Sequence, residues 1–225
     1  MKTKYAGLKN VPVIGRLRTV IEMAKKERLK GKVVVDVGCS NGLLAHYLLD
    51  ERAKEYIGVD PSDNAILLAQ KNVKGPSFAV GTAGNIPVAD GRADVVLLFD
   101  VIEHVPVRTE DEALKECYRV LKKGGVLLLS TPNNHPLTNA LDIAWYAGHR
   151  HYRPEHMEDL LSEAGFRIEL IEVRGGLWFS FYLLWLYSMK WIIGNPMPRS
   201  KFLEARDDAQ FDKTGIHTIF VKAVK

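Results

Sequence analysis

The sequence has little cysteine, no leader-like segment and no uninterrupted apolar run long enough to cross a bilayer. Its two cysteines, Cys39 and Cys117, are too few for a disulfide framework, so a reducing compartment is the default expectation. The first thirty residues are basic and lack an apolar core followed by small residues, which argues against a secretory signal. From these absences we expect a cytoplasmic protein.

Repeats and low-complexity segments are also missing, and the composition is ordinary. The 225 residues are 47% apolar and 26% charged, which excludes a disordered chain, a collagen-like repeat and a coiled coil. Two domains of this total length would each be small and poorly buried. We therefore expect a single domain over residues 1–225.

Positive charge is concentrated at the N-terminus. Residues 1–32 hold ten Lys and Arg against Glu22 and Glu27, while the whole chain has a net charge of +4. Residues 14–29 place apolar side chains at helical spacing, and Gly31 ends the segment. A basic helix of this kind suits anionic lipid, nucleic acid or an anionic substrate, or is simply a solvated helix face.

Short β-branched segments alternate with helix-like segments through most of the chain. Strands are predicted at 33–37, 56–60, 77–80, 94–100, 125–131, 166–173 and 217–224, and helices at 42–50, 62–72, 109–122 and 154–164. Val- and Leu-rich strands between helices indicate a parallel sheet buried on both faces, wound by right-handed crossovers. The pattern predicts a doubly wound α/β core over 32–174, after a basic helix within 1–31. An insertion over 175–215 and a last strand within 216–225 follow.

A glycine-rich turn, VVVDVGCSNG, joins the first predicted strand to a helix. Gly38 and Gly42 allow a ligand to approach backbone N–H groups at the edge of the sheet where such folds bind ligands. Ser40 and Leu43 replace the later glycines of a dinucleotide fingerprint, and no Gly-Lys-Ser/Thr ending marks a P-loop. The turn instead begins with Asp36, which would repel a pyrophosphate and suit an ammonium group.

A second carboxylate, Asp60, ends the next strand and is placed to accept hydrogen bonds from ribose hydroxyls. Asp36 and Asp60 together suit an amino-acid-bearing nucleoside such as S-adenosylmethionine. Four segments resemble, in order, the motifs of class I S-adenosylmethionine-dependent methyltransferases of the type 11 kind, similar to ubiquinone-pathway O-methyltransferases. These segments are VVDVGCSNG, YIGVD, VGTAGNIPVADGRADVVLLFDVIEHV and YRVLKKGGVLLLSTPN. The resemblance covers residues 30–174.

That resemblance implies a Rossmann-like sheet of seven mostly parallel strands with an antiparallel last strand, and a cofactor that leaves as S-adenosylhomocysteine. It places Asp36, Gly38, Cys39, Ser40 and Gly42 at the methionine part, Asp60 at the ribose and Pro61 beside the adenine. Thr82, followed by Ala83, stands where such enzymes usually carry an acid near the adenine. The resemblance also implies that Phe99, Asp100 and Val101 line the wall beside the sulfonium.

The predicted catalytic residues are Glu103 and His104, which lie just beyond the strand predicted at 94–100. They cap the loop and pack on the cofactor, or His104 is a general base, or the pair contributes to a metal site. Asp100-x-x-Glu103-His104 resembles the ligand motif of ubiquinone-pathway and small-RNA 2′-O-methyltransferases, with Asp where those have Glu, and His149 and His151 follow later. The sequence leaves a divalent metal undecided, and we expect none to be required.

Residues 177–193 are apolar almost all round and hold most of the tryptophan. This segment is a buried helix or dimer contact, a lid over an apolar acceptor, or a membrane-surface anchor. We expect a hydrophobic small-molecule acceptor, quinone-like or lipid-like, methylated on a hydroxyl. A metal-dependent RNA 2′-O-methyltransferase and a non-catalytic cofactor-binding regulator are the alternatives, although no nucleic-acid module is evident.

Overall fold

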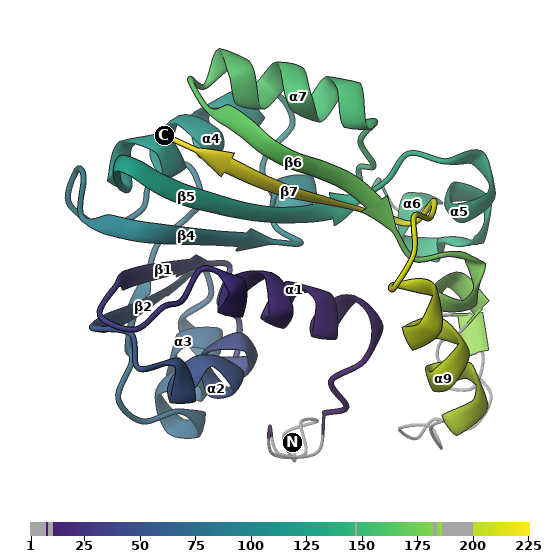
Figure 1. The fold of residues 1–225 in the computed structure, drawn as a ribbon, viewed down its shortest axis with the longest axis horizontal. Coiled ribbons are helices and arrows are strands. Elements are labelled where there is room, and N and C mark those ends of the chain that lie inside the picture. The colour runs from purple at the N-terminus through teal and green to yellow at the C-terminus, as the bar shows by residue number, and fades with distance from the viewer. Residues whose placement is uncertain (1–7, 9–10, 147, 182–183, 186–199) are drawn as a thin grey trace.

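The computed structural model describes residues 8, 11–146, 148–181, 184–185 and 200–225. A seven-stranded sheet runs through the molecule in the order β3-β2-β1-β4-β5-β7-β6 (Figure 1). The strands are β1 (Val33–Val37), β2 (Glu55–Asp60), β3 (Ser77–Val80), β4 (Ala93–Phe99), β5 (Leu121–Pro132), β6 (Arg167–Arg174) and β7 (Thr218–Val224).

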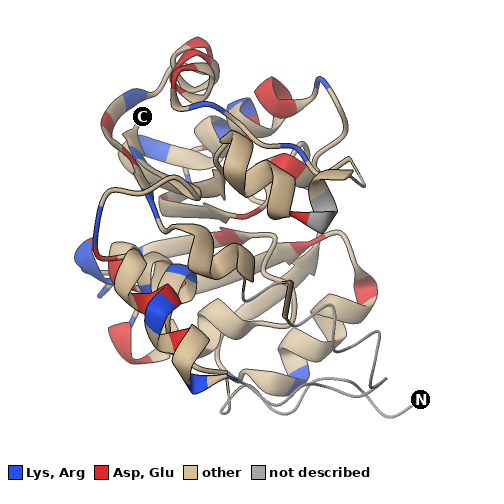
Figure 2. Ribbon diagram, turned by 90° about the vertical axis from the view of Figure 1, so that its right-hand side faces the viewer, with Lys and Arg blue, Asp and Glu red and all other residues tan. Residues whose placement is uncertain are grey.

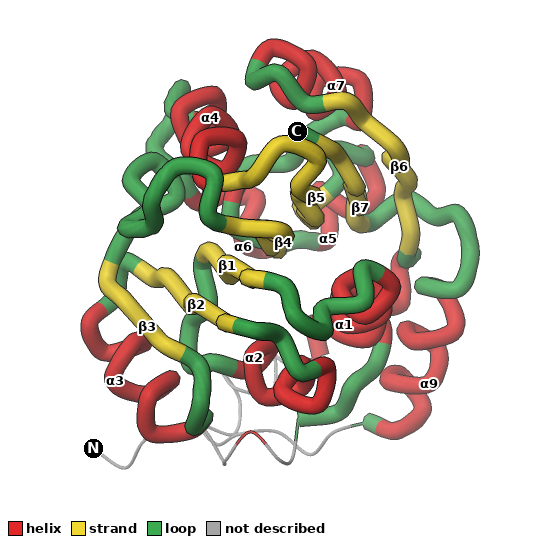
Figure 3. The backbone as a smooth tube through the Cα atoms, turned by 60° about the vertical axis from the view of Figure 1, so that its left-hand side comes forward, coloured by secondary structure: helices red, strands yellow, loops and turns green. Residues whose placement is uncertain are grey.

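Helices connect the strands and cover both faces of the sheet (Figure 3). The α-helices are α1 (Gly15–Lys26), α2 (Leu43–Leu48), α3 (Asp63–Asn72), α4 (Glu110–Val120), α5 (Pro136–Leu141), α6 (Ile143–Tyr146), α7 (Pro154–Glu163) and α9 (Lys201–Gln210). Two short 3₁₀ turns, η2 (Leu49–Glu51) and η3 (Ile102–His104), follow α2 and β4.

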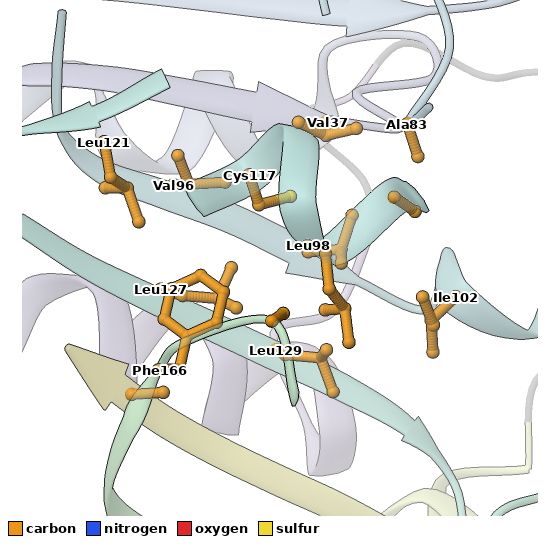
Figure 4. Packing of buried hydrophobic residues seen from close by; sticks show 14 of the residues in the cluster. Val37, Ala83, Val96, Leu98, Ile102, Cys117, Leu121, Leu127, Leu129 and Phe166 are labelled. Carbon is orange, nitrogen blue, oxygen red and sulfur yellow. The ribbon is translucent and has the colours of Figure 1, made fainter. Parts of the chain in front are cut away.

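The strands are apolar on both sides because each face is buried against a different set of helices. On one face, Val96, Leu98 and Leu127 pack against α4 and α7 through side chains such as Cys117 (Figure 4). On the other face, Val95 and its neighbours pack against α1, α2 and α3. This two-sided burial is why the strands lack the polar alternation of a half-exposed sheet.

Strand directions follow the predicted plan. β1 is parallel to β2 and β4, β2 to β3, and β4 to β5, whereas β7 is antiparallel to both β5 and β6. The doubly wound fold with an antiparallel last strand is therefore confirmed. β5 begins at Leu121, four residues before the predicted start, because its pairing with β4 starts at Ala93 and then shifts register.

Helices α5, α6 and α9 were not predicted. The first two have six and four residues, too few to show an apolar period, and α9 buries only Asp207 among its side chains. Of the predicted apolar helix over 177–193, the structure describes 177–181 and 184–185, all helical, and the remainder lies outside the described residues. Across the described ranges we find no helix with the length and apolar character needed to traverse a bilayer.

The basic helix α1 docks on α9 through ion pairs. The Arg18 guanidinium donates to a carboxylate oxygen of Asp208 and to one of Asp212, each at 2.7 Å, and the Gly15 N–H donates to Asp208 at 2.6 Å. On the ribbon of Figure 2, acidic and basic positions are interspersed and not gathered by sign. Part of the N-terminal positive charge is thus neutralised within the fold.

Candidate active site

A cavity of about 430 Å³ opens at the carboxyl ends of β1 to β4, the edge at which doubly wound sheets hold ligands. Its wall is formed by the loops that follow these strands and by the first turn of α4. The lining residues are Val37, Gly38, Pro61, Gly81, Thr82, Ala83, Gly84, Asn85, Val101, His104, Val105, Pro106, Thr109 and Glu112.

The glycine-rich turn is tied to the end of β2. The N–H groups of Gly38 and Cys39 both donate to the Val59 carbonyl, at 2.7 and 3.0 Å. Ser40 has φ +49°, and its N–H donates to one carboxylate oxygen of Asp60 at 2.9 Å. The other Asp60 oxygen accepts from the Ser62 N–H at 2.9 Å. Asp60, half-buried at the strand tip, therefore fixes the turns after both β1 and β2.

Gly38 itself requires glycine. Its φ is +77°, and a Cβ there would lie 2.4 Å from Cγ2 of Val101. The backbone after β1 thus packs directly on the residue after β4, which brings two walls of the cavity together.

Asp36 lies beneath this turn, with 3% of its surface exposed and no place on the cavity wall. The Tyr56 hydroxyl donates to its carboxylate at 2.7 Å. Burial, offset in part by this hydrogen bond, raises the pKa of Asp36 to about 7. Contact between Asp36 and a bound ammonium group stays a prediction, since Asp36 is buried and is not among the residues that line the cavity.

The segment after β3 forms a tight turn on the opposite wall. Thr82 and Asn85 exchange both backbone hydrogen bonds, at 3.2 and 3.1 Å. A Cβ on Gly81 would lie 2.6 Å from the Pro87 ring, so the backbone passes close to its neighbours there. Thr82 and Ala83, which the sequence predicts as cofactor contacts, lie on the cavity wall, and so do Gly84 and Asn85, which it did not single out.

Asp100, after β4, is held by partners from two distant segments. It has φ +54°, and its carboxylate accepts from the Ser130 hydroxyl at 3.0 Å. The other carboxylate oxygen lies 3.2 Å from Nε of Arg16, whose guanidinium also lies over the Phe179 ring at 5.1 Å. Helix α1, the tip of β4 and the aromatic segment after β6 therefore meet at Asp100.

Glu103 and His104 occupy different environments on η3. His104 is exposed and lines the cavity. Glu103 is 4% exposed, and one of its carboxyl oxygens accepts from the Thr131 hydroxyl at 3.1 Å. Burial, reinforced by the neighbouring Asp100 carboxylate, raises the pKa of Glu103 to about 8. Burial thus favours the protonated form of the Glu103 carboxyl, whereas His104 is exposed on the cavity wall.

Arg150 holds the 3₁₀ turn η3, which carries Glu103 and His104, in place. Its guanidinium donates to the backbone carbonyls of Ile102, Glu103 and Val105, and it pairs with Glu110 at the start of α4. Single-sequence patterns gave no signal for Arg150 or for Arg16, because each acts on a segment more than forty residues away.

Histidines flank Arg150. The ring of His149 lies 4.7 Å from that of His104, centroid to centroid, and 5.6 Å from that of His151. Two sets of side chains bring three potential ligand atoms within 4.8 Å of one another: Glu103, His104 and His149, and separately Asp142, His149 and His151. The second set includes a residue, Asp142, that the sequence did not single out.

Six of the predicted site residues line the cavity, and the other eight are not among its lining residues. The six are Gly38, Pro61, Thr82, Ala83, Val101 and His104; the others are Asp36, Cys39, Ser40, Gly42, Asp60, Phe99, Asp100 and Glu103. Burial raises the pKa of the Cys39 thiol far above its usual value, which argues against a nucleophilic thiolate at this position.

Comparisons with known proteins agree on the family. Residues 35–129 match the family described as a methyltransferase domain. A protein of Mycolicibacterium smegmatis named as a probable S-adenosylmethionine-dependent methyltransferase is 30% identical over 155 residues, covering 68% of this chain and 59% of that protein. The ubiquinone biosynthesis O-methyltransferase of Acinetobacter baylyi is 27% identical over 159 residues, covering 63% of this chain and 66% of its own length. The chain thus spans less than two thirds of these relatives.

Solved structures share the fold at low identity. An S-adenosylmethionine-dependent methyltransferase from Mesorhizobium loti superposes with a TM-score of 0.65 at 16% identity, covering 97% of this chain and 100% of its own. The [4+2]-cyclase SpnF superposes with a TM-score of 0.67 at 20% identity, covering 92% and 80%. The fold alone therefore does not decide the reaction.

Proposed function

Because the chain belongs to the class I S-adenosylmethionine-dependent methyltransferases, we propose that it transfers a methyl group from S-adenosylmethionine to a hydroxyl of a hydrophobic small molecule. The observation that carries the proposal is the cavity at the carboxyl ends of β1 to β4, which has the glycine-rich turn on one wall and His104 on another.

The residues around the cavity fit a sulfonium nucleoside. Gly84 has open space where a side chain would lie, so a flat base can approach the backbone closely there. Pro61, Thr82 and Ala83 offer an apolar and backbone surface for adenine, and Asp60 stands at the tip of β2 for the ribose hydroxyls. A cavity of about 430 Å³ lies within the range typical of small-molecule sites.

Methyl transfer from S-adenosylmethionine needs no covalent intermediate with the protein. S-adenosylmethionine supplies a methyl group already activated by its positive sulfur. The protein orients the acceptor in line with that methyl and excludes water, and Val101, Val105 and Pro106 give the wall the necessary apolar character. A hydroxyl acceptor must also lose its proton, and His104 lies on the same wall to accept it.

Glu103 acts in this scheme as a positioning residue. Its buried, protonated carboxyl is bonded to Thr131 and holds the turn on which His104 stands. The proposal therefore gives the proton transfer to His104 alone.

The acceptor class is argued from the apolar wall and from the relatives. Several curated relatives carry the name ubiquinone biosynthesis O-methyltransferase. Phe181 and Trp185, from the aromatic segment after β6, are 45% and 39% exposed, which suits an apolar acceptor or a lipid surface. Attachment to a membrane surface and dimerisation through this segment remain further predictions.

Labelled-methyl transfer tests the proposal. The full chain is incubated with methyl-labelled S-adenosylmethionine and, separately, a catechol bearing a short prenyl tail, the same catechol without the tail, total RNA and a protein extract. We expect label in the tailed catechol, less in the bare one, and none in RNA or protein. His104→Ala should lower transfer at least about a hundredfold without changing cofactor affinity.

His156→Ala is the matched control, since His156 is exposed on α7 and does not line the cavity. Transfer to RNA that a chelator abolishes would favour the RNA methyltransferase instead. Tight cofactor binding with no transfer to any acceptor would favour a non-catalytic regulator, and either result would overturn the proposal.

A further inference from the structure

Three side chains with metal-ligating atoms converge between β5 and α7, outside the Asp100-x-x-Glu103-His104 motif. Asp142 lies between α5 and α6, and His149 and His151 precede α7. A carboxylate oxygen of Asp142 lies 3.0 Å from Nε2 of His151 and 3.8 Å from Nδ1 of His149. The side chains of Asp142, His149 and His151 are 16%, 18% and 3% exposed, respectively, so the cluster is largely shielded from water.

A chain of amides fixes which nitrogen of His151 carries hydrogen. The Asn139 side-chain NH₂ donates to the Asn134 side-chain oxygen at 2.7 Å, which orients the Asn139 amide. Its oxygen then faces Nδ1 of His151 at 2.6 Å. Because an amide oxygen can only accept, Nδ1 of His151 must be the donor.

If the His151 imidazole is neutral, its other nitrogen, Nε2, carries a lone pair and no hydrogen. Nε2 of His151 faces a carboxylate oxygen of Asp142 at 3.0 Å, so two lone pairs meet unless a positive charge lies between them. A proton on Nε2 or a metal cation would supply that charge. Nδ1 of His149 favours a metal cation, because it is buried, lies 3.8 Å from the same carboxylate and makes no hydrogen bond within the described residues.

We propose that Asp142, His149 and His151 bind a divalent transition-metal ion such as Zn²⁺. Two imidazoles and one carboxylate are a common ligand set for this ion and leave a fourth position for water. Asn139 would then be the outer partner that orients His151, as metal-bound histidines usually require.

The backbone holds the site in place before any ion arrives. The Tyr152 N–H donates to the Pro132 carbonyl at 3.0 Å, and the Asn134 N–H donates to the Tyr152 carbonyl at 2.7 Å. These bonds tie the segment after His151 to the end of β5. Arg150, between the two histidine ligands, clamps η3, and the His149 ring packs on that of His104. An ion at this site would therefore fix the position of His149 against the cavity residue His104.

The alternative set, Glu103, His104 and His149, suits a cation less well. The Glu103 carboxyl is deeply buried and already accepts from Thr131, and His104 is exposed on the cavity wall. The two sets share only His149, so substitutions elsewhere tell them apart.

Metal binding to the full chain tests the inference independently of the proposed transfer. After dialysis against a chelator, the protein is titrated with Co²⁺ and Zn²⁺, followed by visible absorption and by metal analysis after gel filtration. We expect one ion per chain. Asp142→Asn and His151→Gln should each weaken binding at least about a hundredfold, and Asn139→Leu about ten- to a hundredfold. Glu103→Gln and His156→Ala should leave metal affinity unchanged.

Imidazole ¹⁵N shifts of the wild-type chain provide a readout that does not depend on how variants fold. Added Zn²⁺ should shift Nε2 of His151 and Nδ1 of His149 and leave His46 and His156 unaffected. Failure of the wild type to retain an ion, with both nitrogens of His151 protonated, would overturn the proposal in favour of a His151–Asp142 ion pair. Binding lost in Glu103→Gln and kept in Asp142→Asn would place the ion on the other set and overturn it too.

Discussion

At the scale of single residues, the site depends on carboxyl groups whose surroundings differ sharply. Asp60 is half-buried and held by two backbone N–H groups, whereas Asp36 and Glu103 are buried and accept hydrogen bonds from hydroxyls. The sequence predicted all three as site residues from their positions at or just beyond the ends of strands. It could not give their protonation, because Tyr56 and Thr131 become neighbours only when the sheet forms.

Asp60→Ala should weaken binding of S-adenosylhomocysteine about ten- to a hundredfold, or roughly 1.5–3 kcal/mol, through loss of charge-assisted hydrogen bonds to the ribose. Titration calorimetry measures this directly. Asp63→Ala is the control, because Asp63 is an exposed acid in the first turn of α3. Equal affinity in the wild type and Asp60→Ala would refute the ribose assignment.

Glu103→Gln should stabilise the protein at high pH. The pKa of Glu103 is about 8 in the fold, above the usual 4.5 of a glutamate, so from about pH 4.5 to 8 the folded chain keeps a proton that the unfolded chain loses. The Glu103 contribution to stability therefore falls as pH rises through this window. Glutamine keeps the acceptor for Thr131 without the ionisation.

Urea unfolding at pH 5 and pH 9 measures the difference between wild type and Glu103→Gln. We expect the variant to gain on the order of 2–4 kcal/mol relative to wild type between the two pH values. A difference that does not change with pH would show that the carboxyl ionises normally.

At the scale of elements, the strands and the longer amphipathic helices were predictable, whereas the very short helices α5 and α6 and the polar helix α9 were not. β1 and β3 have the predicted bounds, because each is a short apolar run that ends at a glycine, Gly38 or Gly81. α9 was missed since its sequence is polar and its docking depends on Arg18, almost two hundred residues earlier. The bend of the chain after β4, with Asp100 at positive φ, also has no local signature.

Gly38→Ala should lower both stability and cofactor affinity. A left-handed backbone costs a non-glycine residue about 1–2 kcal/mol, and the added Cβ would also collide with Val101. Gly124→Ala is a matched control: its φ is the same, +77°, but no atom lies within 4 Å of its added Cβ.

Thermal unfolding should therefore show loss in both glycine variants, while S-adenosylhomocysteine affinity should fall only in Gly38→Ala. Normal affinity in Gly38→Ala would mean that the turn does not shape the cofactor site.

Arg150→Ala should destabilise the fold by roughly 2–3 kcal/mol, because it leaves the carbonyls of η3 and the Glu110 carboxylate without their cation. Arg150→Lys should recover only part of this, since an ammonium cannot span several acceptors at once. Urea midpoints of the three proteins measure both effects. Equal stability of the Ala and Lys variants would contradict the clamp.

At the scale of the whole molecule, the strand order places the site. The chain winds outward from β1 to β3, then crosses back to β4 on the other side of β1, which leaves a switch point between β1 and β4. Alternating segments predicted this topology, and the four motifs predicted which strand ends would meet there. The contribution of α1 through Arg16 could not be predicted, because nothing in a basic helix indicates which carboxylate it will contact.

A crystal structure of the chain grown with S-adenosylhomocysteine tests the central claim most directly. We expect the adenine against Pro61 and Thr82–Ala83, the ribose at Asp60 and the sulfur facing Val101 and His104. An empty cavity with the nucleoside bound elsewhere, or with a dinucleotide filling it in preference, would contradict the account.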